Sequence, residues 1–228
     1  MENFDALHRS TFDTLYKIFH NVIKMLQTRG YKETFLDSLL GLDVEHIQTN
    51  IQKGTINISV DHETEDKQVY VFFVWTPGVS YKKQKFVTHL QNIITQMKED
   101  KFKNIIFIYN CKHSFDKFIA EQNQEHMHDP KGYQIEFFEY NYFYIPVVDH
   151  TLNPTVEILS IEERNKVFTQ YNCSASTLPA IKDTDPLIRW YGLKPGTVCR
   201  MIRQNPLTGL SISYSTVIFD SQRDKKKK

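Results

Sequence analysis

The sequence predicts an α+β chain of two domains: an α/β domain over residues 1–144 and a smaller mixed α/β domain over residues 145–219. Before residue 144, β-branched and aromatic runs alternate with stretches of helical periodicity, which is typical of helices layered on a sheet. After residues 144–150 the predicted elements become shorter. A chain of 228 residues is long enough to bury two small cores.

The first predicted element is an amphipathic helix that ends at Gly30. Its apolar face consists of Leu15, Ile18, Phe19, Val22, Ile23 and Leu26. A glycine just past the last turn is a common helix stop, because glycine tolerates a left-handed backbone. The polar stretch that follows contains Asp43, Glu45 and His46, and it predicts the end of a helix and a loop.

The rest of the first domain is predicted to alternate between strands and helices. The strand-like segments are residues 55–60, 68–75, 105–109 and 133–138. The helical segments are residues 80–97, with Ser80 as a possible N-cap, and residues 114–123. This alternation is what favours an α/β layer in the first domain.

Two helices of the second domain have clear start signals. Ser160 and Glu163 have the spacing of a capping box, which predicts a helix as far as Tyr171. Asp185-Pro186 supplies an acidic cap and a proline at the first helical position, and Gly192 ends this short helix.

A hairpin is predicted at the end of the second domain. Pro195 and Gly196 stand where a type II turn needs them, and residues 197–203 follow as a strand. The chain turns at residues 205–209. The returning strand, residues 210–217, places three side chains on one face: Leu210, Ile212 and Tyr214.

The charge balance argues against an autonomous DNA-binding domain. The net charge is +1 and the isoelectric point is about 7.7. DNA-binding domains usually carry a clear basic excess, because their affinity comes from neutralising phosphates. Any contact with nucleic acid is therefore expected to be local, or to form part of a larger basic surface.

Cysteine usage and hydropathy point to the interior of a cell or of a viral factory. Cys111, Cys173 and Cys199 are too far apart for a zinc motif and are odd in number, so a reducing compartment is expected. The first residues lack the apolar core of a signal peptide. The longest apolar runs are too short to span a bilayer, so no membrane association is expected.

No segment predicts catalysis, a metal or a cofactor. Residues 61–66 are rich in carboxylates, but the next strand, residues 69–75, lacks the acid and lysine of a metal-dependent nuclease, so a solvated loop is favoured. His126 and His128 could meet a metal from a strand, but Pro130 and Gly132 favour a loop with surface histidines. Nucleophile elbows and phosphate-binding glycine loops are missing from the sequence.

One group of polar residues is a candidate phosphate site. Lys112, His113, Ser114 and Lys117 lie where a predicted strand ends and a predicted helix begins. Helix N-termini and short polar groups suit a phosphate. An ordinary capped helix with exposed lysines explains the same residues, and local sequence alone favours this alternative.

The second domain resembles a known family over many spaced positions. The matching positions are 150–154, 157–160, 162–163, 171, 178–179, 181, 185–196, 198, 202–203, 208–209, 212, 214 and 217. This pattern resembles the small archaeal RNA polymerase subunit that equals the C-terminal domain of the fifth common subunit of eukaryotic DNA-directed RNA polymerases. The run Asp-Pro…Arg…Tyr-Gly-Leu-Lys-x-Gly at 185–196 is its most specific part. Residues 15–18 and 28–31 resemble the opening helix of the eukaryotic form, and residues 71–73, 77–79 and 104–106 match more loosely.

The resemblance implies a non-catalytic subunit of a multisubunit DNA-directed RNA polymerase. It implies that residues 145–219 are an assembly domain that docks on the largest subunit. It also implies that residues 1–144 are a jaw domain flanking downstream duplex DNA. The candidate interface residues are Asp185, Pro186, Arg189, Trp190, Tyr191, Gly192, Lys194 and Arg203. Trp190 and Tyr191 fit a place in the core equally well.

Several positions depart from the family pattern. Pro195-Gly196 stands where the family usually has a basic residue and glycine, and His113-Ser114-Phe115 replaces Thr-Pro-Ser in the downstream-DNA loop. Asn205-Pro206 and a run of serines replace a Ser-Glu pair and several arginines. Residues 220–228 form an extra lysine-rich tail that is expected to be disordered.

The departures and the composition are consistent with a polymerase of a large DNA virus or a fast-evolving protist. The expected place is the nucleus for a cellular protein, and the host cytoplasm or the virion for a viral one. Two alternatives stay open. One is a free-standing nucleic-acid-binding or transcription adaptor protein that reuses the fold. The other is a divalent-metal nuclease acting through residues 61–66.

Overall fold

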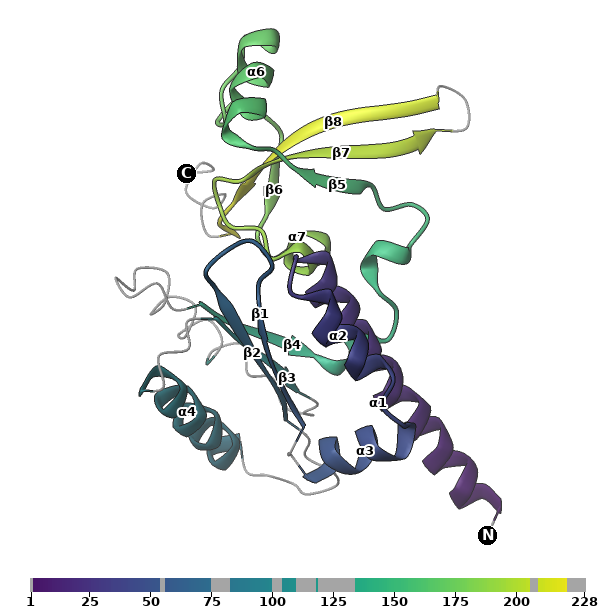
Figure 1. The fold of residues 1–228 in the computed structure, drawn as a ribbon. Coiled ribbons are helices and arrows are strands. Elements are labelled where there is room, and N and C mark those ends of the chain that lie inside the picture. Colours follow the sequence, from purple (N-terminus) through teal and green to yellow (C-terminus); the bar gives the residue numbers. More distant parts are fainter. Residues whose placement is uncertain are drawn as a thin grey trace. The chain divides into compact units, whose positions relative to one another are not determined.

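The computed structural model describes residues 2–53, 56–74, 83–99, 104–109, 118, 134–205 and 209–220. The chain folds as two compact units, Met1–Tyr144 and Ile145–Lys228 (Figure 1). Both units combine helices with a sheet, so the prediction of a mixed α/β chain is confirmed. Each unit is described by itself.

The N-terminal unit is built on a mixed sheet of four strands among the described residues. The strands are β1 (Asn57–Asp61), β2 (Gln68–Val74), β3 (Asn104–Tyr109) and β4 (Gln134–Glu139). They lie side by side in chain order, with β1 antiparallel to β2, and β2, β3 and β4 parallel to one another. All four strands were predicted, with ends that differ by one or two residues.

Helices cover both faces of this sheet (Figure 1). The long helix α1 (Glu2–Thr28) packs on one face, where the rings of Phe19 and Phe73 lie 5.7 Å apart. The helix α4 (Lys83–Glu99) packs on the other, with Leu90 and Ile94 in one cluster with Phe107. Because both faces are covered, β3 is buried from its second residue to its last, which explains its continuous apolar run.

The region after α1 corrects one prediction. The expected loop around Asp43, Glu45 and His46 is wrong, because the chain forms α2 (Glu33–Leu40) and α3 (Val44–Lys53) there. Asp43 starts α3: its Oδ1 accepts a hydrogen bond from the Val44 N–H at 2.8 Å. Ile47 and Ile51, four residues apart, are fully buried. These helices bury few apolar residues each, so their apolar periodicity in the sequence is weak. Packing against α1 is what stabilises them.

Gly30 ends α1 as predicted. Its N–H donates to the Gln27 carbonyl at 2.9 Å, and the Tyr31 N–H donates to the Leu26 carbonyl at 3.1 Å. This is a Schellman arrangement, which needs a left-handed residue, and Gly30 has φ +80°. A Cβ at Gly30 would lie 2.9 Å from Nε2 of His62. The glycine therefore serves both the helix end and the close approach of the β1–β2 loop.

The C-terminal unit is built on a second four-stranded sheet in the described residues, with strand order β5-β7-β8-β6. The strands are β5 (Thr155–Ile158), β6 (Ala180–Lys182), β7 (Val198–Asn205) and β8 (Gly209–Ile218). Neighbours are antiparallel except β6 and β8, which are parallel. The hairpin β7–β8 was predicted, whereas the short strands β5 and β6 were not.

Two helices pack on opposite faces of the second sheet. Helix α7 (Pro186–Tyr191), with the 3-10 turn η2 (Val147–Asp149), covers the face that carries Cys199 and Met201. Helix α6 (Ile161–Tyr171) covers the face that carries Val198. The unit therefore has one small core on each side of its sheet.

The local signals of this unit are confirmed. Ser160 and Glu163 form a reciprocal capping box at the start of α6. Asp185 caps α7, Pro186 occupies its first turn, and Gly192 ends it with φ 64°. The Thr197 N–H donates to the Lys194 carbonyl at 3.0 Å, and Gly196 has φ 91°, as a type II turn requires.

Several predictions lie outside the described residues. These are the N-cap at Ser80, the helix at 114–123, the histidines at 126 and 128, and the tail beyond residue 220.

Candidate subunit interface

Three of the interface candidates around α7 stabilise the two ends of this helix. Asp185 accepts a hydrogen bond from the Leu187 N–H through Oδ1 at 2.9 Å, which satisfies one of the helix's free amides. Pro186 fits the first turn, because its missing N–H would have no helical partner. The Gly192 N–H donates to the Arg189 carbonyl at 3.1 Å and closes the last turn.

Trp190 belongs to the core. Its side chain is fully buried, so the structure favours the core over the interface for this residue. Tyr191 is half-buried against the cluster that contains Leu187 and Cys199, and burial raises its pKa, which a hydrogen bond with the Val156 backbone partly offsets. An interface role for Tyr191 stays a prediction.

Arg189, Lys194 and Arg203 are the candidates with polar side chains that reach the surface. Arg189 is half-buried, and Lys194 and Arg203 are exposed. Arg203 lies opposite Ser211 near the end of the β7–β8 hairpin, whereas Arg189 lies in α7 and Lys194 follows its end. The three candidate contacts therefore lie in two separate parts of the C-terminal unit, the β7–β8 hairpin and the region of α7.

Sequence reasoning missed the exposed apolar surface of the C-terminal unit. Among the described residues of this unit, the exposed large apolar side chains are Ile145, Leu152, Ile158, Ile161, Tyr171, Leu210 and Ile212. The alternation at 210–214 indicated that Leu210 and Ile212 share a face. It could not show that α6 covers only the part of that face that includes Tyr214.

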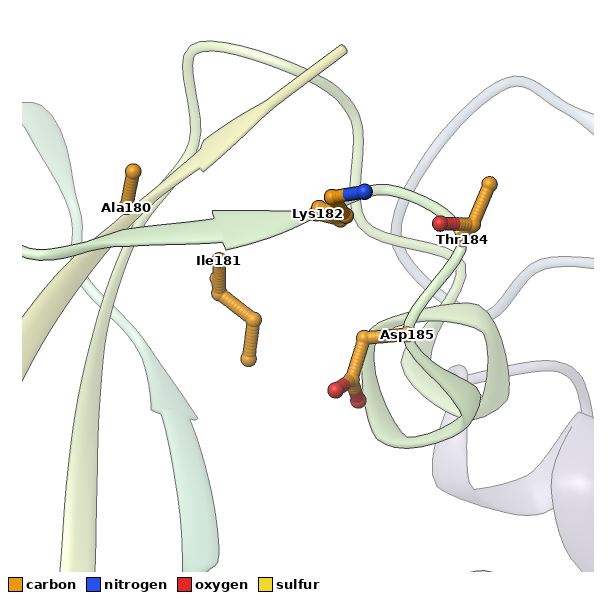
Figure 2. Close-up of a pocket in the computed structure, with 5 residues that line it drawn as sticks. All are labelled: Ala180, Ile181, Lys182, Thr184 and Asp185. Carbon is orange, nitrogen blue, oxygen red and sulfur yellow. The ribbon is translucent and has the colours of Figure 1, made fainter. Parts of the chain in front are cut away.

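A small hollow lies beside β6 and the start of α7. Ala180, Ile181, Lys182, Thr184 and Asp185 line a volume of about 290 Å³ (Figure 2). Its charged groups are already engaged, since Lys182 pairs with Asp220 and Asp185 caps α7. The hollow therefore presents no assembled catalytic group.

The thiol of Cys199, one of the two cysteines of this unit, is not activated. Cys199 is fully buried, and its Sγ donates a hydrogen bond to the Ser215 carbonyl at 3.5 Å. Burial raises the pKa of this thiol to about 11, so it is protonated at neutral pH. Cys199 acts as a small apolar core residue.

The acidic loop at residues 61–66 has structural partners. Asp61 pairs with Lys32 at 2.9 Å, and Glu65 pairs with Lys67 at 2.8 Å. His62 lies 3.0 Å from the Arg29 carbonyl through Nε2 and accepts the Glu65 N–H through Nδ1. Within the described residues, no cluster of histidine, cysteine and acidic side chains could hold a metal ion. These contacts favour a capped surface loop over a nuclease site.

Two further observations concern the predicted DNA contacts and membrane-spanning helices. The candidate DNA contacts Lys112, His113, Ser114 and Lys117 lie outside the described residues. None of the helices in the described part of the chain has the length and apolar character needed to cross a membrane.

Comparison with known proteins identifies the family. The family model described as RNA polymerase Rpb5, C-terminal domain, matches residues 145–217. DNA-directed RNA polymerases I, II, and III subunit rpabc1 of Dictyostelium discoideum is 30% identical over 88% of this chain and 95% of its own length. DNA-directed RNA polymerase subunit 5 of Acanthamoeba polyphaga mimivirus is 23% identical over 92% of this chain and 95% of its own length. The chain belongs to the RNA polymerase subunit 5 family, as the resemblance predicted.

An archaeal relative matches a stretch of this chain that is about as long as the family match at residues 145–217. DNA-directed RNA polymerase subunit Rpo5 of Methanocaldococcus jannaschii is 43% identical over 72 residues. The match covers 32% of this chain but 92% of the archaeal protein. A polymerase subunit of this family can therefore consist of little more than a counterpart of the C-terminal unit.

Proposed function

We propose that this chain is a non-catalytic subunit of a multisubunit DNA-directed RNA polymerase. The observation that carries the proposal is the near full-length match to a eukaryotic polymerase subunit at 30% identity, over 95% of that relative. The engaged polar groups of the C-terminal hollow and the protonated Cys199 thiol agree with a role without chemistry of its own. The comparisons give no support to a free-standing adaptor.

The C-terminal unit is the assembly domain in this proposal. The archaeal relatives support this, because their counterpart of the unit makes up most of a polymerase subunit by itself. We propose the largest polymerase subunit as the partner on which this unit docks, together with contacts to other subunits. Arg189, Lys194 and Arg203 are the candidate polar contacts.

The N-terminal unit is the jaw domain in this proposal, and it flanks the downstream duplex. Lys112, His113, Ser114 and Lys117 would contact phosphates without reading sequence. A net charge of +1 supports a subunit that is held in place by protein contacts and adds a few local phosphate contacts.

The location of the protein depends on whether its polymerase is encoded by a cell or by a virus. A cell-encoded enzyme of this kind works in the nucleus. A virus-encoded copy, like the mimivirus relative, would work in a viral factory of the host cytoplasm or be carried in the virion.

The test is affinity purification of the tagged chain from its native source, with high-salt washes, mass spectrometry of the eluate and an RNA synthesis assay. We expect the two large polymerase subunits to elute in fixed ratio with the chain, together with activity. Elution of the chain without polymerase subunits would overturn the proposal. Fractionation of the same cells into nuclei and cytoplasm, with analysis of purified virions where a virus is the source, then decides among these locations.

A further inference from the structure

The outer edge of β8 is open over most of its length. On one side, β8 pairs with β7 from Gly209 to Thr216. On the other side, β6 pairs only with Thr216–Ile218. Among the described residues, no strand pairs with residues 209–215 on that outer side. Figure 1 shows this part of the hairpin extending away from α6.

The hydrogen bonds of β8 show which main-chain groups face the open edge. The Val217 N–H points inward and donates to the Thr197 carbonyl at 2.9 Å. The Thr216 N–H points outward and donates to the Pro179 carbonyl at 2.9 Å. Main-chain groups alternate in direction along a strand, so those of Tyr214, Ile212 and Leu210 face outward.

The same three residues place apolar side chains on one face of the sheet. Tyr214 is packed in the cluster under α6, and the Arg200 guanidinium lies 5.8 Å from its ring centre. Beyond Tyr214, the side chains of Ile212 and Leu210 are 54% and 65% exposed. The open edge and the uncovered apolar side chains therefore coincide.

This edge lacks the protection that free strand edges carry. Soluble proteins block such edges with charged residues, proline, bulges or covering segments, because unprotected edges pair with other chains. Residues 209–215 read Gly-Leu-Ser-Ile-Ser-Tyr-Ser, with no charge and no proline. An edge of this composition suits a chain that is covered by a partner when it works.

We propose that the open edge of β8 receives an extended, apolar segment of another polymerase subunit as an added strand. Such a segment would bond to the outward groups of Leu210, Ile212 and Tyr214 and cover the first two side chains. This inference rests on the proposed function. Another subunit is favoured over a second copy of this chain because the counterpart of this unit, nearly alone, makes up a subunit of the archaeal polymerase.

Two substitutions of the same chemistry test the proposal. Ile212→Lys places a charge on the apolar face of the open edge. Ser211→Lys places the same charge one residue earlier, on the opposite face, and serves as the matched control. Ile212→Pro removes the outward N–H, a change that an edge strand can accept without losing a bond to β7. Each tagged full-length variant is produced in the native source beside the untagged chain.

The readout is the ratio of tagged to untagged chain in the purified polymerase, measured by mass spectrometry. We expect Ile212→Lys and Ile212→Pro to lower this ratio by about tenfold or more, as loss of a central interface contact does, and Ser211→Lys to keep it near the wild-type value. Thermal unfolding of the isolated variants is expected to match the wild type, because Ile212 is half-exposed in the isolated chain.

The outcomes separate this inference from the proposed function. If the wild-type chain enters the polymerase and the Ile212 variants enter equally well, the added strand is wrong and the subunit function stands. If the wild-type chain itself does not enter, the proposed function fails first. If the isolated wild-type chain dimerises and Ile212→Lys abolishes the dimer, the occupant is a second copy and the proposal is overturned.

Hydrogen exchange supplies an independent readout. In the isolated chain, we expect the Ile212 amide to exchange rapidly and the Ser211 and Ser213 amides, which face β7, to be protected. In the polymerase, all three are expected to be protected. Rapid exchange of the Ile212 amide in the polymerase would contradict strand addition.

Discussion

Arg29 and Glu136 form a bidentate ion pair that joins the end of α1 to the edge strand β4. The Nη1–Oε1 distance is 2.7 Å and the Nη2–Oε2 distance is 2.8 Å. The side chain of Arg29 is 7% exposed and that of Glu136 is 31% exposed. The Arg29 guanidinium also lies 5.9 Å from the ring centre of Phe138. Burial opposes the charge of Arg29, but Glu136, together with Tyr31 and Tyr142, outweighs it and raises the Arg29 pKa.

We expect Glu136→Leu to destabilise the N-terminal unit by about 3 kcal/mol, because it removes the carboxylate that balances a buried guanidinium. The double variant Arg29→Met, Glu136→Leu is expected to recover most of this loss, since neither charge then remains buried. Urea unfolding of the full chain measures both. Equal midpoints for Glu136→Leu and the wild type would show that the pair contributes nothing.

The capping box of α6 predicts a pH dependence for the C-terminal unit. The hydrogen bonds with the Ser160 backbone and side chain lower the Glu163 pKa from its ordinary value of 4.5. A carboxylate with a lowered folded pKa stabilises fully above the unfolded pKa and loses this effect as pH falls through the folded pKa. Glu163→Gln is thus expected to lower the melting temperature at neutral pH and to approach the wild type in acid.

The matched control for this prediction is Glu162→Gln, which removes an acid from the same helical turn and leaves the capping box intact. Melting curves between about pH 3 and pH 7 compare the three proteins. A gap between Glu163→Gln and the wild type that widens toward acid would contradict the sign. Ser160→Ala is expected to cost about 1 kcal/mol through loss of the cap.

Trp190 predicts a stability effect rather than a binding effect. Because its side chain is fully buried, Trp190→Ala is expected to destabilise the C-terminal unit by about 3–5 kcal/mol in the isolated chain. The exposed Lys194 provides the comparison, and Lys194→Ala is expected to change stability by less than about 0.5 kcal/mol. Denaturation of the isolated chain is the measurement. A stable Trp190→Ala variant that fails to join the polymerase would instead place Trp190 at the interface.

The proposed DNA contact predicts a salt effect in the assembled polymerase. Lys112→Ala combined with Lys117→Ala is expected to weaken retention of downstream duplex DNA on every sequence alike. It is also expected to reduce the slope of log affinity against log salt by about two. Lys53→Ala, at the end of α3, is the control for a general change in charge. An unchanged slope for the double variant would remove these two lysines from the DNA path.

Sequence patterns predicted the elements whose signals are local. The capping residues Ser160 and Glu163, and the glycines Gly30 and Gly192, act within one or two turns of chain, so their roles can be seen in the sequence. The strand β3 is buried on both faces, and its unbroken apolar run reflects this. Helices α2 and α3 were missed, because a short helix with one or two buried residues resembles a polar loop until its partner helix is known.

Sequence patterns were thus sufficient to predict the class of fold, the C-terminal end of α1, both ends of α6 and α7 and, through spaced matches after residue 150, the family. Only the tertiary structure decided which apolar and charged residues face each other. The pairing of Arg29 with Glu136 spans 107 residues, and no local pattern indicates it. For Leu210 and Ile212, the alternation in the sequence indicated only that the two side chains share a face. That α6 covers only the Tyr214 end of this face and leaves Leu210 and Ile212 exposed depends on packing between distant segments, which a periodic pattern cannot express.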